Sequence, residues 1–148
     1  MKNDIIVIDA SNLLLGRLST IAAKQLLLGK SVVIVNSEKA VISGSRRSIL
    51  EEAKSRLQTR TLGSQRKAPK HPRRPEGLVR RAVRGMLPID KSKGQKAYKK
   101  LRVYVDIPEN ITVKEAMTLP EATASKGTRS LTLNEVAKNI GWKPLKED

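Results

Sequence analysis

The sequence predicts an α/β fold, and the first 36 residues carry the main indication. Two short apolar runs, Asp4–Ala10 and Ser31–Asn36, have the length and composition of buried strands. The segment 13–30 between them repeats leucine, isoleucine and alanine at the spacing of one helix face. A strand, a helix and a strand in such a short stretch form a βαβ unit, whose strands run parallel with a right-handed crossover.

The ends of the first helix have recognisable signals. Ser11 or Asn12 is expected to cap its N-terminus by accepting a backbone N–H bond, and Gly29 to end it in a left-handed conformation. Gly16 lies inside this helix, where glycine is unfavourable by about 1 kcal/mol relative to alanine. It indicates either close approach of RNA or another chain, or tight packing against the sheet.

The remaining elements alternate in type along the chain. In order, we expect a very short strand at Lys39–Gly44, a helix at Ser45–Arg60, an extended loop at Thr61–Arg74, a helix at Pro75–Met86, a loop and short basic helix within Asp90–Leu101, a strand at Leu101–Pro108 and a closing helix at Thr132–Trp142. Thr132 and Glu135 have the spacing of a capping box.

Composition excludes several classes of protein. The chain has no cysteine, so disulfides and thiolate metal sites are absent. No apolar run approaches the ~20 residues of a membrane helix, and the apolar N-terminal run is too short for a signal peptide. A cytoplasmic protein is therefore expected.

Charge is the strongest signal in the sequence. Thirty Lys and Arg against fourteen Asp and Glu give a net charge of +16. Residues 45–105 hold nineteen of these basic residues and only four acidic ones, whereas residues 106–148 hold six basic and seven acidic residues. Such a localised excess predicts a surface that binds a polyanion, most commonly nucleic acid.

The kind of contact can also be inferred. Only three residues of the chain are aromatic, too few for a platform that stacks successive bases, so we expect contacts to phosphates and backbone shape. In the helix 75–86, the residues Leu78, Val79, Ala82, Val83 and Met86 are spaced to bury one face. Its arginines, Arg80, Arg81 and Arg84, then face the RNA.

The predicted RNA-binding residues come from the basic loop, the neighbouring helices and the first helix. They are Arg17, Arg46, Arg47, Arg60, Arg66, Lys67, Lys70, His71, Arg73, Arg74, Arg80, Arg81, Arg84, Gly85, Lys91 and Lys93. No catalytic, metal or cofactor site is expected, because a lone histidine rarely binds a metal and nucleotide-binding glycine motifs are missing. Asp9 is expected to tether the turn that follows the first strand.

Two stretches resemble a known family. "DASNLLLGRLSTIAAKQLLLGKSVVIVNSEKAVISG" (Asp9–Gly44) and "VRRAVRGMLP" (Val79–Pro88) resemble the large-subunit ribosomal protein L13 family, and the match covers most of residues 4–105. The resemblance implies a three-layer α/β/α domain around a four-stranded, mainly parallel sheet. It also implies contacts to ribosomal RNA and to neighbouring ribosomal proteins, and a part in early subunit assembly. The positions that match the family's contact residues are Arg17, Arg80, Arg81, Arg84 and Gly85.

The C-terminal part lacks the endings of bacterial and eukaryotic members, which indicates an archaeal type. We expect one domain over residues 1–148, with an α/β core at 1–105, a basic insert at 61–100 and an acidic extension at 106–148 packed on the core. The predicted function is a structural component of the large ribosomal subunit, not an enzyme, without cofactor, membrane partner or homo-oligomer. Two alternatives remain: an RNA-modifying or nucleotide-binding enzyme with its ligand near Asp9–Asn12 and Asn36, and a free RNA chaperone or translational regulator.

Overall fold

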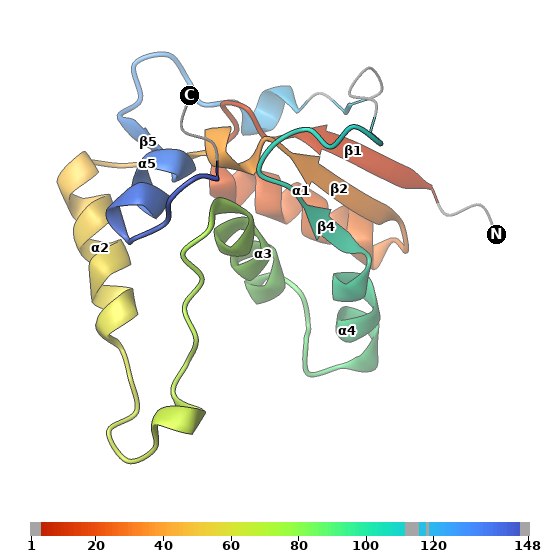
Figure 1. The fold of residues 1–148 in the computed structure, drawn as a ribbon. Helices are drawn as coiled ribbons and strands as arrows, with labels where there is room; N and C mark the ends of the chain where they lie inside the picture. Colours follow the sequence, from red (N-terminus) through yellow and green to blue (C-terminus); the bar gives the residue numbers. More distant parts are fainter. Residues whose placement is uncertain (1–3, 112–115, 118, 146–148) are drawn as a thin grey trace.

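The centre of the structure is a three-stranded parallel sheet (Figure 1). The computed structural model describes residues 4–111, 116–117 and 119–145. The strands β1 (Ile5–Asp9), β2 (Ser31–Val35) and β4 (Leu101–Val103) lie in the order β1-β2-β4. Ile8 pairs with Ile34, and Ile34 pairs with Val103, so apolar side chains of all three strands point to the same face.

Three helices cover that face. α1 (Leu15–Leu27) connects β1 to β2, which confirms the predicted βαβ unit. α3 (Pro75–Gly85) contacts both α1 and β4, and α4 (Ser92–Lys99) contacts α1. The core between helices and sheet is made of fully buried aliphatic side chains: Ile8, Leu18, Leu26, Ile34, Val79, Val83 and Leu101. Burial of this kind is the main stabilising contribution to a domain with almost no aromatic residues.

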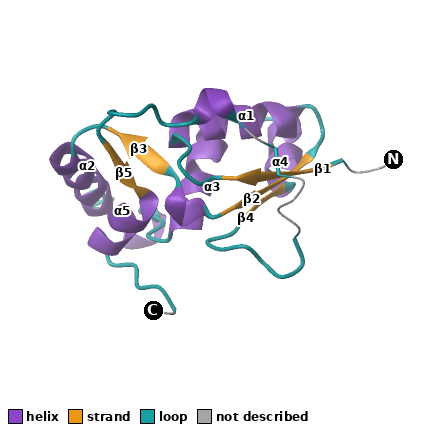
Figure 2. Ribbon diagram, turned by 90° about the horizontal axis from the view of Figure 1, so that it is seen from above, coloured by secondary structure: helices purple, strands orange, loops and turns teal. Residues whose placement is uncertain are grey.

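A smaller sheet lies beside the first (Figure 2). β3 (Val41–Ser43) pairs antiparallel with β5 (Ser130–Thr132), and α2 (Arg46–Gln58) and α5 (Leu133–Asn139) follow these two strands. Ile49, Leu131 and Val136 form a second apolar cluster there. The C-terminal segment thereby packs against elements from the first half of the chain.

The expected four-stranded sheet and its three layers are not confirmed. The third predicted strand exists, but Asn36 adopts a left-handed conformation (φ 54°) and a 3-10 turn, Ser37–Lys39, follows, so β3 leaves the plane of the parallel sheet. Along the outer edge of β1, the described residues form one parallel bridge, Ile8 to Met117. α1 and α3 contact each other while packing on β2 and β4, which places both helices on one face of the sheet.

Gly29 and Thr132 act at helix ends as the sequence predicts, whereas the N-cap of α1 differs from the prediction. Gly29 (φ 90°) follows the end of α1, and the Thr132 hydroxyl accepts the Glu135 N–H as predicted. The N-cap of α1, however, is Leu14 without a side-chain cap, so the expectation of Ser11 or Asn12 was wrong. The chain still has to turn after β1, and Asn12 (φ 58°) supplies that turn.

Other boundaries shift by a few residues. β4 ends at Val103, five residues before the end of the strand predicted at Leu101–Pro108. The basic loop Thr61–Arg74 contains a 3-10 turn at Gln65–Lys67. Over the described residues, no helix has both the length and the apolar character needed to cross a membrane.

Candidate nucleic-acid interface

The helix α3 positions the central arginines. Pro75 occupies its first turn, where a missing N–H costs nothing, and Glu76 and Arg84 sit at the ends that the helix dipole favours for their charges. Val79 and Val83, one turn apart, are fully buried and fix the helix to α1 and β4. The opposite face is thereby held toward solvent.

The prediction of which residues form the apolar face of α3 is only partly correct. Leu78 and Ala82 are half-buried and line a cavity, while Met86 is 43% exposed. The helix ends at Gly85, so Met86 no longer follows helical spacing. Its Sδ instead accepts a hydrogen bond from the Thr20 hydroxyl at 3.4 Å.

The end of the basic loop is attached to the folded part of the chain. His71 Nε2 lies 3.2 Å from the Thr59 carbonyl oxygen. Arg73 Nη1 donates to the Ile140 carbonyl oxygen at 3.1 Å, and Arg81 donates to the Lys70 carbonyl oxygen. In Figure 1 the loop descends from α2, away from the sheet, and returns to the start of α3.

A basic pocket lies where this loop meets α3 and α4. Its volume is about 540 Å³, and its lining contains no acidic side chain. Arg80 is half-buried, with its guanidinium carbon 5.3 Å from the centre of the Tyr98 ring, a cation–π distance. The complete lining consists of Lys70, His71, Pro72, Gly77, Arg80, Arg81, Arg84 and Tyr98.

Other predicted contact residues are engaged in ion pairs or backbone contacts. Arg46 pairs with Glu135 at 2.6 Å, Arg47 with Glu51 at 2.8 Å and Arg74 with Glu76 at 2.6 Å. Arg17 donates to the Glu121 carbonyl oxygen at 3.0 Å. These side chains are exposed, and an ion pair of this kind contributes little to stability, so they stay accessible to a polyanion.

The remaining predicted residues are exposed and carry no ion pair within the described part of the chain. They are Arg60, Arg66, Lys67, Lys70, Arg81, Arg84, Lys91 and Lys93, and the backbone of Gly85 is exposed beside them. They extend from the basic loop along α3 to the start of α4. The structure therefore gathers cations that are far apart in the sequence on neighbouring elements.

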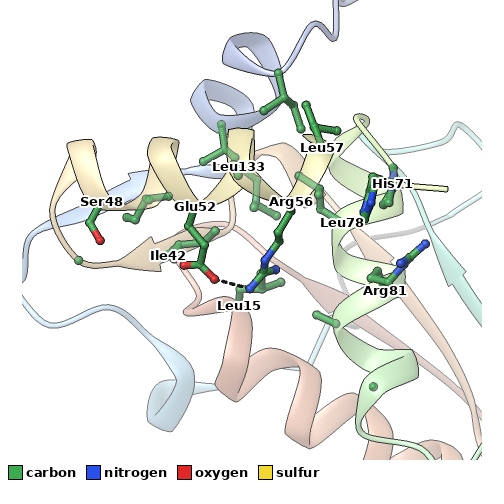
Figure 3. Close-up of a pocket in the computed structure, with 18 of the residues that line it drawn as sticks. Leu15, Ile42, Ser48, Glu52, Arg56, Leu57, His71, Leu78, Arg81 and Leu133 are labelled. Atoms are coloured by element: carbon green, nitrogen blue, oxygen red, sulfur yellow. Dashed lines mark hydrogen bonds and ion pairs between the residues drawn. The ribbon is translucent and has the colours of Figure 1, made fainter. Parts of the chain in front are cut away.

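A second, larger cavity has a different character. It measures about 600 Å³ and lies between α2, α3 and α5 (Figure 3). Leu57, Leu78 and Leu133 supply part of its apolar wall, and the Glu52 carboxylate is occupied by an ion pair with Arg56. His71 is the only imidazole on the lining, and the described residues contain no group of three or more potential metal ligands.

The turn after β1 is built as a structural tether. Asp9 Oδ1 accepts hydrogen bonds from the Ser11 N–H (3.0 Å), the Ser11 hydroxyl (2.7 Å) and the Asn36 amide (3.0 Å). Burial works to raise the pKa of Asp9, but these bonds and the charge of Lys39 outweigh it and leave the pKa below its usual value. Asp9, Ser11 and Asn36, where an enzyme would hold its ligand, are thus hydrogen-bonded to one another.

Three residues of the basic pocket, Pro72, Gly77 and Tyr98, were missed by the sequence prediction. Tyr98 lies in a lysine-rich helix and showed no pattern of its own. Gly77 did carry a signal, because it stands in the first turn of a helix where alanine would be more favourable. An ideal Cβ at this position would lie 2.7 Å from the Cβ of Pro72, so glycine is what allows the loop to approach α3.

The βαβ-based fold, with exposed cations on the basic loop, α3 and the start of α4, defines a small, basic α/β protein. The family model described as "Ribosomal protein L13" matches residues 3–110, and the chain belongs to this family. The resemblance stated from the sequence is thereby confirmed, and this family is one of structural proteins, not of enzymes.

Curated relatives agree along nearly the whole chain. "Large ribosomal subunit protein uL13" of Archaeoglobus fulgidus is 42% identical over 146 residues, which is 97% of this chain and 92% of the relative. The protein of the same name from Aeropyrum pernix is 41% identical over 93% of this chain and 90% of the relative. That from Thermoplasma volcanium is 41% identical over 91% of this chain and 97% of the relative. These relatives confirm the archaeal type.

Proposed function

We propose that this chain is a structural component of the large ribosomal subunit that binds ribosomal RNA through its basic centre and takes part in early subunit assembly. Its place is the ribosome in the cytoplasm, and its partners are large-subunit RNA and neighbouring ribosomal proteins. The observation that carries the proposal is the basic loop with α3 and the start of α4, where eight exposed cations lack an ion pair among the described residues.

The physical role of the two parts differs. The aliphatic core fixes α1, α3 and α4 on the parallel sheet, and the cations that these helices and the loop carry neutralise RNA phosphates. Because the cations stand on separate elements, the protein holds RNA segments in a fixed relative position. We also propose that the 16 predicted contact residues bind the RNA. The chain forms one domain over residues 1–148, acts as a monomer and has no membrane partner.

Segment 106–148 supports RNA binding indirectly, by packing against the elements that carry the cations. α5 contacts both α2 and α3, and the hydrogen bond from Arg73 to Ile140 joins it to the basic loop. We assign this segment the task of supporting the RNA-binding elements, and the ion pair between its Glu135 and Arg46 agrees with that role.

Two measurements test the proposal. Affinity for large-subunit ribosomal RNA should fall by about 10³–10⁵ between 50 and 200 mM salt if six to ten phosphates are contacted. The tagged protein, expressed in cells, should co-sediment with large ribosomal subunits at one copy per subunit. A flat salt response, or a chain found mainly outside the subunit fraction, contradicts the proposal; the second outcome would favour a free RNA-binding regulator.

A further inference from the structure

The basic pocket is more than a patch of surface charge. Four cationic side chains, Lys70, Arg80, Arg81 and Arg84, line it without an acidic neighbour on the lining. Crowding like charges opposes folding, and this repulsion is removed when an anion enters. The pocket is therefore built for an anionic ligand.

The size and lining of the basic pocket indicate a ligand larger than a single phosphate group. The pocket is widely open to solvent and measures about 540 Å³, which leaves room for more than one phosphate group. The Arg80 guanidinium is backed by the Tyr98 ring, and guanidinium planes are surfaces on which RNA bases stack. A ligand with both a phosphate and a flat ring uses both features.

Contacts within the chain also shape the pocket. Gly77 lets Pro72 approach the helix, and the hydrogen bond from Arg81 to the Lys70 carbonyl holds the end of the basic loop to α3. Preorganised groups lose less conformational entropy on binding, which favours specific over diffuse attraction. A solvated cationic face needs neither feature.

We propose that the basic pocket receives one unstacked nucleotide of the bound RNA. Arg81, Arg84 and Lys70 hold the phosphate, and the base lies against Arg80, which Tyr98 supports. This rests on the proposed RNA-binding function and adds a preference to it: the protein selects RNA in which one nucleotide is free to leave the helical stack.

Two RNAs test the preference, a fully paired duplex and the same duplex with one unpaired nucleotide in the middle of one strand. The full-length protein is expected to bind the bulged RNA about tenfold more tightly, in the range that stacking of one base supports. Tyr98→Leu, which keeps apolar bulk, should lose the preference, and Tyr98→Phe, which keeps the ring, should retain it. Gly77→Ala should also lose it, because the new methyl group displaces Pro72.

Lys93→Ala is the matched control, because Lys93 is exposed on the same helix as Tyr98 but does not line the pocket. It should weaken binding of both RNAs equally. Equal affinity of the wild-type protein for the two RNAs, or a preference that survives Tyr98→Leu, overturns the inference. In either case a steep salt dependence for both RNAs leaves the proposed function standing, whereas failure to bind either RNA refutes that function itself.

Discussion

Arg73 Nη1 donates a hydrogen bond to the Ile140 carbonyl oxygen, 3.1 Å away, and so joins the basic loop to the end of α5. The next residue, Gly141, makes this contact possible. It has φ 103°, and an ideal Cβ at this position would lie 2.8 Å from the same Nη1 atom. The C-terminal segment thus holds a cation of the loop in place through a backbone position that only glycine fills without strain.

Gly141→Ala should therefore destabilise the protein and release the loop. A left-handed conformation costs alanine about 1–2 kcal/mol, and the new Cβ displaces Arg73. Urea unfolding should show this loss, and trypsin should cut faster after Lys67 and Lys70. Gly63→Ala in the same loop is the control, because an ideal Cβ there would meet no atom within 4 Å and no positive φ is required. Equal stability of the two variants would contradict this assignment.

Two of the helical glycines, Gly94 and Gly16, should respond in opposite directions to the same substitution. A Cβ at Gly94 would overlap the Pro88 carbonyl group, so Gly94→Ala must push α4 from the preceding turn and cost about 2–3 kcal/mol. Gly16 is exposed, and an ideal Cβ there would have no atom within 4 Å, so Gly16→Ala should stabilise the isolated chain by up to about 1 kcal/mol. Thermal unfolding measures both, and destabilisation by Gly16→Ala would refute this account.

The sequence left two explanations for the glycine at position 16, and the exposure of Gly16 excludes one of them. Tight packing against the sheet was wrong, since the glycine faces away from the core. Close approach of RNA or another chain stays a prediction. It is tested by the same variant: Gly16→Ala should be more stable when isolated, yet less abundant in purified large subunits.

Unpaired cations should contribute more to RNA binding than paired ones. Arg84 has no ion pair among the described residues and lines the basic pocket, whereas Arg46 pairs with Glu135 at 2.6 Å. Arg84→Ala should weaken RNA binding and reduce the slope of log affinity against log salt by about one. Arg46→Ala should change that slope less, because RNA must compete with Glu135 for the side chain. A larger effect at Arg46 would contradict the ranking.

Patterns that depend on neighbours in sequence were predictable. The apolar run at β1, the helical spacing of α1 and the proline that begins α3 each act within a few residues, and each element formed where its pattern indicated. The capping hydroxyl of Thr132 is equally local.

Features that depend on distant pairing were not predictable in the same way. A three-residue strand such as β3 carries no sign of its partner, and its pairing with β5 joins segments about ninety residues apart. The N-cap of α1 failed because Ser11 bonds to Asp9 instead, a competition between two local partners. Tyr98 entered the basic pocket only through the packing of α4 near α3, which no spacing along the chain encodes.

The tether at Asp9 should make stability depend on pH in a defined direction. Because the folded-state pKa of Asp9 is below its unfolded value, ionised Asp9 stabilises the fold above pH about 4, and this contribution disappears as pH falls through the lowered pKa. Asp9→Asn should lower the free energy of unfolding at pH 7 by about 1 kcal/mol, since the site is partly exposed, and the difference from wild type should shrink below pH 4.

Glu38 provides the opposite case nearby. Burial raises its pKa above the usual value, and the charges of Asp106 and Asp9 add to this shift while a backbone hydrogen bond and Lys39 oppose it. The ionised carboxylate therefore costs stability at neutral pH, and the cost disappears as pH falls below the usual glutamate range. Glu38→Gln should stabilise the protein at pH 7 and match wild type near pH 3, as measured by urea unfolding over the pH series. Destabilisation by Glu38→Gln at pH 7 would contradict this account of Glu38, and stabilisation by Asp9→Asn would contradict the account of the tether.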